Sequence, residues 1–143
     1  MSVPRILIIE DNPADIRLLR QALDEQHQSY VLQVLTDGEA AIAFLRDHCA
    51  AAHDPCLIVL DLHLPRYDGL SVLRAIRSMP SLAGVRVAVL TTIASPAEEA
   101  EVRRLGVSWY AKKPADLDAF LDLGRTLIQL CHDAATAVAA LPT

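Results

Sequence analysis

The stretch Leu57-Ile-Val-Leu-Asp-Leu-His-Leu-Pro-Arg-Tyr-Asp-Gly69 decides the fold. Its first four residues, Leu57–Leu60, are all apolar, which is typical of a strand buried on both faces. The run ends in the carboxylate of Asp61, and Pro65 with Asp68-Gly69 predicts a turn before a following helix. Open α/β sheets bind ligands at the carboxyl ends of their strands, so Asp61 is a candidate metal ligand or nucleophile.

Polar side chains also close the other apolar runs. The remaining strands are predicted at Arg5–Glu10, Tyr30–Leu35, Arg86–Thr91 and Ser108–Ala111. Acids end the first run at Glu10-Asp11, a hydroxyl ends the fourth at Thr91, and Lys112-Lys113 follows the fifth. Because parallel strands end at a common edge, we expect these groups to meet Asp61 there.

Segments with helical periodicity separate the strands, which is the pattern of βα units and a parallel sheet. Asn12-Pro13 and Ser95-Pro96 predict helix starts, because each pairs a capping side chain with a proline in the first turn. Gln33 interrupts the second apolar run, so that strand is expected near an edge of the sheet.

The last helix is predicted to be long, over about residues 115–134, with a tail at 135–143; a continuation through the Ala-rich segment from Ala134 to Ala140 is left open. Its expected core stripe begins at Leu117 and includes Phe120 and Leu127. Leu123 and Leu130 lie off that stripe and are interpreted as part of a dimer surface.

The composition favours one globular domain over residues 1–143, without an output domain. The net charge of −5 excludes a general nucleic-acid surface, which needs a basic patch. No apolar run approaches the roughly 20 residues needed to span a bilayer. The N-terminus lacks a secretory pattern, and three cysteines at no framework spacing fit the reducing cytoplasm.

Taken together, the strand-end motifs resemble the receiver domain of bacterial response regulators. The motifs are Glu10-Asp11, Asp61–Gly69, Leu90-Thr91 and Tyr110–Pro114, within a resemblance from about Arg5 to Cys131. It implies an α/β fold: a doubly wound five-stranded parallel sheet, flavodoxin-like (βα)5, in strand order 2-1-3-4-5. Glu10–Arg17 and Lys113–Leu117 look most like stand-alone receivers that partner bacterial phytochromes and related hybrid sensors.

The resemblance also implies a role for each residue at the predicted edge. Asp61 is the expected phosphoacceptor, and Lys113 and Thr91 are expected to contact the phosphoryl group. As Thr91 moves, Tyr110 is expected to turn inward and change the surface that partners read. Lys113 is preferred to Lys112 because it stands three residues after Tyr110 and directly before a proline. Such a protein catalyses only its own phosphorylation and dephosphorylation, so it is not expected to be an enzyme.

A divalent cation is expected among the acids. Glu10, Asp11 and Asp61 would repel one another without a hard cation, and all-oxygen ligands favour Mg²⁺ or Mn²⁺ over zinc. Asp11 and Asp61 are assigned as direct ligands, and Glu10 as a ligand through water. The resemblance adds the backbone carbonyl of His63.

Other classes fit less well. A dehalogenase-type phosphatase also uses a strand-end Asp, but it expects a second carboxylate two residues later, where His63 stands. A Rossmann nucleotide binder would have a glycine-rich first loop, whereas Glu10–Pro13 is acidic. A pseudo-receiver adaptor, which folds but is never phosphorylated, stays open. One further His/Cys-rich patch matches no common zinc spacing: His48, Cys49, His53 and Cys56.

The expected partners follow from the resemblance. They are a sensor histidine kinase, with a phytochrome-type kinase as the first expectation, and a second copy of the chain. The copies are expected to meet through the face formed by the fourth helix, fifth strand and fifth helix. Neither nucleic acid nor a membrane is expected as a partner.

Overall fold

The computed structural model describes residues 3–48, 57–64, 67–82 and 84–140, apart from the side chains of His48 and residues 134–140. Its elements alternate along the chain as βα units. They are β1 (Arg5–Ile9), α1 (Pro13–Asp24), β2 (Val31–Leu35), α2 (Gly38–His48), β3 (Leu57–Asp61), α3 (Gly69–Ser78), the short 3₁₀ helix η1 (Pro80–Leu82), β4 (Arg86–Thr91), α4 (Pro96–Arg104), β5 (Trp109–Lys112) and α5 (Leu117–Ala140).

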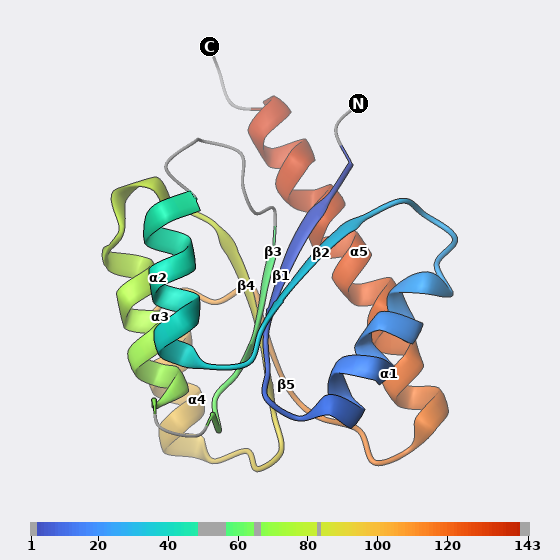
Figure 1. The fold of residues 1–143 in the computed structure, drawn as a ribbon, viewed down its shortest axis with the longest axis horizontal. Helices are drawn as coiled ribbons and strands as arrows, with labels where there is room; N and C mark the ends of the chain where they lie inside the picture. The colour runs from blue at the N-terminus through green and yellow to red at the C-terminus, as the bar shows by residue number, and fades with distance from the viewer. Residues whose placement is uncertain (1–2, 49–56, 65–66, 83, 141–143) are drawn as a thin grey trace.

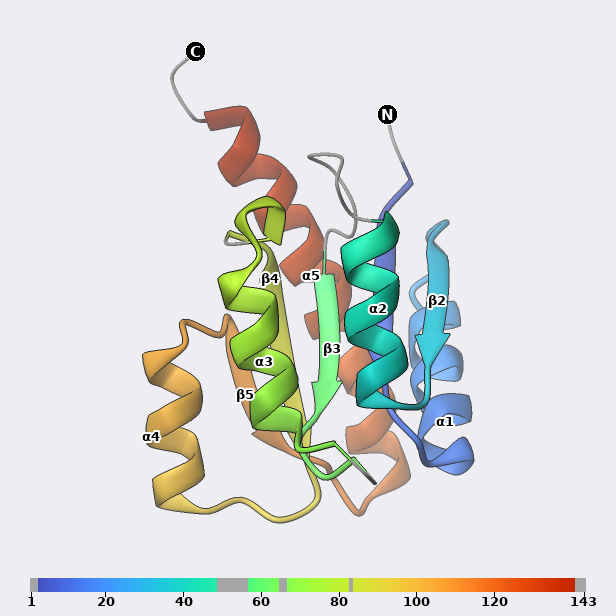
Figure 2. The ribbon, with the colours of Figure 1, turned by 60° about the vertical axis from the view of Figure 1, so that its left-hand side comes forward.

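The strands form one parallel sheet in the order β2-β1-β3-β4-β5, which confirms the predicted fold class and strand order. Helices α1 and α5 cover one face of this sheet, and α2, α3 and α4 cover the other (Figures 1 and 2). The arrangement has three layers, with the strand that ends at Asp61 in the middle.

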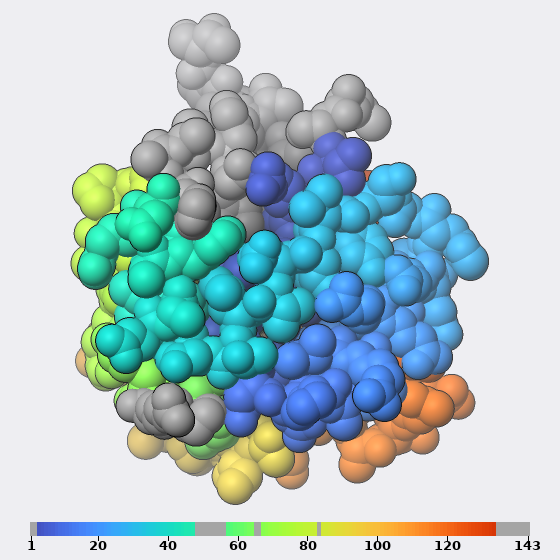
Figure 3. Space-filling view, in the orientation of Figure 1, coloured from blue at the N-terminus to red at the C-terminus, as the bar shows by residue number. Residues whose placement is uncertain are grey.

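Burial along the strands follows their position in the sheet. All five residues of β3 are buried, as expected for a central strand covered on both faces. By contrast, β2 has no fully buried residue, and Val31 is 48% exposed, as predicted for an edge strand. Figure 3 shows the side chains of this edge between those of α2 and α1.

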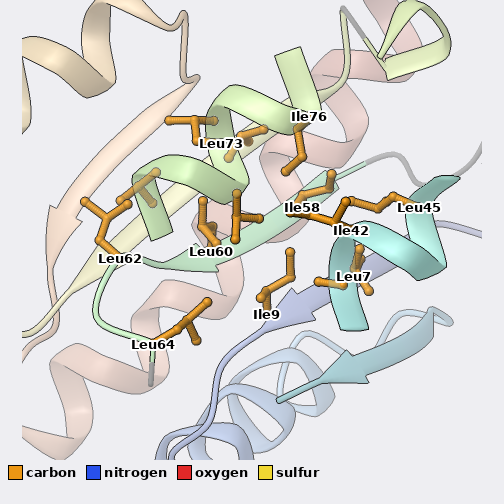
Figure 4. Packing of buried hydrophobic residues seen from close by; sticks show 14 of the residues in the cluster. Leu7, Ile9, Ile42, Leu45, Ile58, Leu60, Leu62, Leu64, Leu73 and Ile76 are labelled. Carbon is orange, nitrogen blue, oxygen red and sulfur yellow. The ribbon is translucent and has the colours of Figure 1, made fainter. Parts of the chain in front are cut away.

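Two apolar clusters hold the helices to the sheet. The first joins α2 and α3 to β1, β3 and β4, and Figure 4 shows it around Ile58, Leu60 and Leu73. The second packs α1 and α5 on the opposite face and includes Leu19 and Leu127. Such burial, at about 25 cal/mol per Å² of apolar surface, is the main force that holds α/β layers together.

Helix α5 differs from the prediction in three ways. It ends at Ala140 rather than at about residue 134, which is the continuation that the sequence left open. Leu123, predicted to lie on a dimer surface, is buried in the second cluster, and Leu130 is partly buried against it. Leu117, predicted in the core, is 53% exposed. The cause is that α5 packs against both the sheet and α1, so its buried face is broader than one stripe and begins after Leu117.

Two glycines permit close approaches between elements. A Cβ at Gly69 would lie 2.4 Å from the Cα of Leu62, so only glycine fits the turn between β3 and α3. A Cβ at Gly124 would lie 2.0 Å from the carbonyl oxygen of Ala22, where α5 meets α1. Both positions therefore fix distances around the sheet that a larger residue would change.

Two expectations from the sequence concern other parts of the chain. In the portion that the structure describes, none of the helices has the length and apolarity needed to cross a membrane. The His/Cys-rich patch from His48 to Cys56 lies outside the described side chains.

Candidate phosphoacceptor and metal site

The predicted site residues come from four strand ends at one edge of the sheet. Asp61 is the last residue of β3, Glu10 directly follows β1, and Thr91 ends β4. Lys113 directly follows β5, and its backbone N–H donates to the carbonyl of Thr91 at 2.8 Å. The parallel register brings all four together, as the sequence predicts.

Three carboxylates form the acidic part of the site. One oxygen from each of Glu10, Asp11 and Asp61 lies within 4.8 Å of the other two. Glu10 and Asp61 are buried, at 2% and 5% exposure, and Asp11 is partly buried. Glu10 Oε2 is buried without a hydrogen-bond partner among the described residues. Close acids with a free buried oxygen fit a hard divalent cation such as Mg²⁺ or Mn²⁺.

The ammonium of Lys113 points into this acidic group. Its Nζ lies 2.5 Å from Glu10 Oε1, 2.8 Å from Asp15 Oδ2 and 3.5 Å from Asp61 Oδ2. Lys112, the other candidate, is exposed on β5. The structure therefore brings Lys113, the lysine preferred from the sequence, to the acids.

Asp15 is a site residue that the sequence pattern did not indicate. It belongs to the first turn of α1 and stands four residues after Asp11, which is about one helical turn. The cap of α1 fixes this turn, because Asn12 Oδ1 accepts from the backbone N–H groups of Ala14 and Asp15 at 2.9 and 3.3 Å. An acid one turn after a strand-end acid is the signal that could have revealed it.

The pKa values of the two buried acids move in opposite directions. Burial, together with the nearby Asp61 carboxyl group, raises the pKa of Glu10 to about 9 against the lowering effect of Lys113. Burial also acts to raise the pKa of Asp61, but the neighbouring Glu10, the His63 N–H and the Lys113 ammonium together outweigh it, and the net pKa is lowered. Asp61 is therefore the more readily ionised of the two buried acids.

The pKa of Lys113 is raised even though its burial acts to lower it. Hydrogen bonds to Asp15 and Glu10 outweigh the burial, with a further contribution from the Asp61 charge. The site therefore favours a charged ammonium next to an ionised carboxylate, which is suited to binding a group with several negative oxygens.

His63 contacts the site through its backbone. Its N–H donates to Asp61 Oδ1 at 3.0 Å. The imidazole points elsewhere: Nε2 lies 3.4 Å from the carbonyl of Ile93 and 3.8 Å from Glu98 Oε2. The ring lies outside the acidic group, and the expected role of the His63 backbone carbonyl as a metal ligand stays a prediction.

The two predicted switch residues lie on neighbouring strands. Thr91 is fully buried, and its Oγ1 donates to the carbonyl of Ile93 at 3.0 Å. The hydroxyl of Tyr110 is buried without a hydrogen-bond partner in the described parts of the chain. Burial raises the Tyr110 pKa, and the charge of nearby Glu98 adds to this effect. The tyrosine hydroxyl is already buried in this structure, so the predicted turn of the ring on phosphorylation stays a prediction.

Comparisons with known proteins agree with this geometry. The family model described as response regulator receiver domain matches residues 6–123. The response regulator Rcp1 from Synechocystis sp. is 38% identical over 114 residues, which cover 78% of each chain. This chain belongs to the response regulator receiver domain family.

Solved structures place the chain near one group within that family. The phosphorylated cyanobacterial phytochrome response regulator RcpA is 33% identical, with a TM-score of 0.82, and the match covers 99% of this chain and 100% of that one. The Mn²⁺-bound form of Rcp1 is 34% identical, with a TM-score of 0.77 and coverage of 86% and 90%. A receiver close to these phytochrome response regulators is therefore the class that fold and site define.

Proposed function

We propose that this protein is a phosphorylation-controlled receiver in a two-component pathway of the cytoplasm, with Asp61 as its phosphoacceptor. The arrangement that carries the proposal is the ionised Asp61 carboxylate between the Lys113 ammonium and a group of three close acids. The names of the relatives RcpA and Rcp1 support a phytochrome-type histidine kinase as the phosphoryl donor.

The chain's own residues supply most of what phosphoryl transfer requires. An Asp61 oxygen attacks the phosphorus of a phosphohistidine, the P–N bond breaks, and its electron pair goes to the leaving imidazole, which takes up a proton from the solvent. The Lys113 ammonium and the Thr91 hydroxyl each donate to a phosphoryl oxygen. Glu10, Asp11, Asp61 and the His63 carbonyl would hold a divalent cation, which supplies charge neutralisation at the phosphoryl group.

The same contacts connect the chemistry to a change of shape. Thr91 Oγ1 is bonded to the carbonyl of Ile93 and would leave it to bond a phosphoryl oxygen. Ile93 lies between β4 and α4, so this exchange would alter the chain that leads into α4 and the setting of Tyr110. A partner that binds the altered surface more tightly would shift the population toward it.

The phosphoacceptor is tested by comparing wild type with Asp61→Asn. Each is incubated with Mg²⁺ and acetyl phosphate, and intact mass is measured at once. We expect one added phosphoryl group on wild type and none on Asp61→Asn. Asp47→Asn, an exposed acid of α2, is the matched control and should be labelled like wild type. Equal labelling of wild type and Asp61→Asn, or no labelling of wild type, would contradict the proposal.

We also propose that two copies pair through the face formed by α4, β5 and α5. With Leu123 buried, the support comes from Leu117, an exposed leucine at the start of α5. Sedimentation before and after phosphorylation tests this, with Leu117→Ser as the variant expected to weaken pairing. A wild-type monomer in both states at high concentration would end the dimer proposal without affecting the phosphoacceptor.

A further inference from the structure

The Lys113 ammonium has one carboxylate partner that lies outside the group of three close acids. The group consists of Glu10, Asp11 and Asp61. Asp15 is not a member, yet its Oδ2 lies 2.8 Å from Lys113 Nζ, closer than Asp61 Oδ2 at 3.5 Å. The lysine is therefore held from two sides, by strand-end acids and by an acid of α1.

The Lys113 ammonium has as many N–H donors as it has carboxylate partners. An ammonium has three N–H donors, and Nζ has three carboxylate partners: Glu10, Asp15 and Asp61. The Lys113 side chain is 9% exposed and that of Asp15 is 20% exposed. Little water reaches the ammonium, so losing a partner would leave a donor of a nearly buried charge unsatisfied.

A cation and a phosphoryl group would change two of these three contacts. Both Glu10 and Asp61 belong to the acidic group, so their oxygens would turn to the cation, and Asp61 would also carry the phosphoryl group. Asp15 belongs to another element and is fixed by the Asn12 cap of α1. Its contact with the ammonium is the one that neither event removes.

We propose that Asp15 is a positioning residue for Lys113, which keeps the ammonium beside Asp61 while the cation and the phosphoryl group engage the other carboxylates. This inference rests on the proposed function. It differs from the ordinary role of an acid in the first turn of a helix, which is to stabilise the helix through its dipole. A helix-dipole effect alone would stabilise α1 and would not change the affinity of the site for a phosphoryl group.

Beryllofluoride, a stable mimic of the phosphoryl group, provides the test. Its affinity is measured by ¹⁹F NMR at saturating Mg²⁺ for wild type, Asp15→Asn and Asp15→Glu. We expect Asp15→Asn to bind about tenfold more weakly, the equivalent of one charge-assisted hydrogen bond. Asp15→Glu keeps the carboxylate and should recover part of the loss. Asp122→Asn, an exposed acid of α5, is the control and should bind like wild type.

A second pair of measurements shows whether Asp15 acts through Lys113. Asp15→Asn is repeated in the Lys113→Ala background, where it should cause no further loss, because coupled residues give non-additive effects. An equal loss in both backgrounds would overturn the inference, as would a wild-type affinity, or a tighter one, in Asp15→Asn. Failure of wild type to bind Mg²⁺ and beryllofluoride would instead contradict the proposed function.

Discussion

The two ends of α4 are attached to the molecule in different ways. At the carboxyl end, Arg77 of α3 donates to the backbone carbonyls of Leu105, Gly106 and Val85 at 2.8, 3.0 and 2.8 Å. Val102, near the same end, is the residue of α4 that is fully buried. Arg77 therefore links this end to α3 and, through its bond to Val85, to the chain before β4, while Val102 joins this end to the core.

At the amino end, which lies at the same edge of the sheet as the end of β3 (Figure 2), the contacts are fewer: a local cap, and the His63 imidazole at 3.8 Å from Glu98 Oε2. The cap is a bond from the Glu98 N–H to Ser95 Oγ at 3.1 Å. Glu98 Oε1 and the Tyr110 hydroxyl are both buried without hydrogen-bond partners within the described residues. The comparison indicates a helix with a fixed carboxyl end and a less firmly held amino end, so a change at Asp61 would move its first turn most.

The largest expected effect is at the fixed end. Arg77→Ala should lower the free energy of unfolding by about 3 kcal/mol, because the backbone carbonyls of three residues lose a charged donor. Urea unfolding measures the change. Arg74→Ala, one turn earlier on α3, removes an ion pair to Glu101 from a side chain that is 51% exposed, and it should cost less than about 1 kcal/mol. Similar losses of stability in Arg77→Ala and Arg74→Ala would contradict the conclusion that Arg77 fixes the carboxyl end of α4.

The next effect concerns the buried residue of α4. Val102→Ala should cost about 2 kcal/mol, since it removes two methyl-sized groups from the core and leaves a cavity. Thermal or urea unfolding provides the measurement. Val31→Ala on the exposed edge strand is the control and should have a clearly smaller effect. A cost at Val102 no greater than at Val31 would mean that the carboxyl end is not anchored in the core.

A smaller effect is expected at the cap of the amino end. Ser95→Ala should cost about 1 kcal/mol, because the Glu98 N–H loses its acceptor. Amide hydrogen exchange locates the change: protection should fall in the first turn of α4 and stay unchanged near Val102. Ser108→Ala, an exposed serine before β5, serves as control. Loss of protection along the whole helix would show that its two ends are not independent.

The smallest effect is electrostatic. The Glu98 charge contributes to the raised pKa of Tyr110, so Glu98→Gln should lower that pKa toward its ordinary value. Ultraviolet titration of tyrosinate measures it, with Tyr110→Phe to identify the transition and Tyr30, whose pKa is raised to about 12, as the internal comparison. An unchanged Tyr110 pKa in Glu98→Gln would show that the Glu98 charge does not act on Tyr110.

The raised pKa of Tyr110 also predicts how the stability of the protein changes with pH. A raised pKa means that folded Tyr110 keeps a proton that the unfolded chain releases above about pH 10. Stability should therefore fall as the pH rises from about 10, and Tyr110→Phe should remove part of that fall. Denaturant unfolding at several alkaline pH values measures the effect, and a steeper alkaline loss in Tyr110→Phe would contradict this sign.

The sequence predicts those parts of the molecule that depend on the chain's local pattern. The apolar run of β3 and the polar residues that follow the strands are read directly, because a parallel sheet brings its carboxyl ends to one edge. Asp61 and Lys113 are found this way. Arg77 is not, because its acceptors are backbone carbonyls that only the folded chain brings together.

The errors have a related cause. The contact of Asp15 depends on how α1 is rotated against the sheet, which helical periodicity does not determine. The prediction for Leu123 is wrong because a single stripe assumes one packing partner, whereas α5 has two. Both cases concern the geometry between elements, and the sequence specifies that geometry less directly than it specifies the elements.

The close contact between Gly124 and Ala22 also affects the ion pair between Asp15 and Lys113. Asp15 is carried by α1, while Lys113 stands just before α5, so the gap between the two helices also sets the span between carboxylate and ammonium. A methyl group at position 124 would wedge the helices apart at Ala22. An alanine there, harmless in most helices, would weaken the contact between Asp15 and Lys113 without touching either residue.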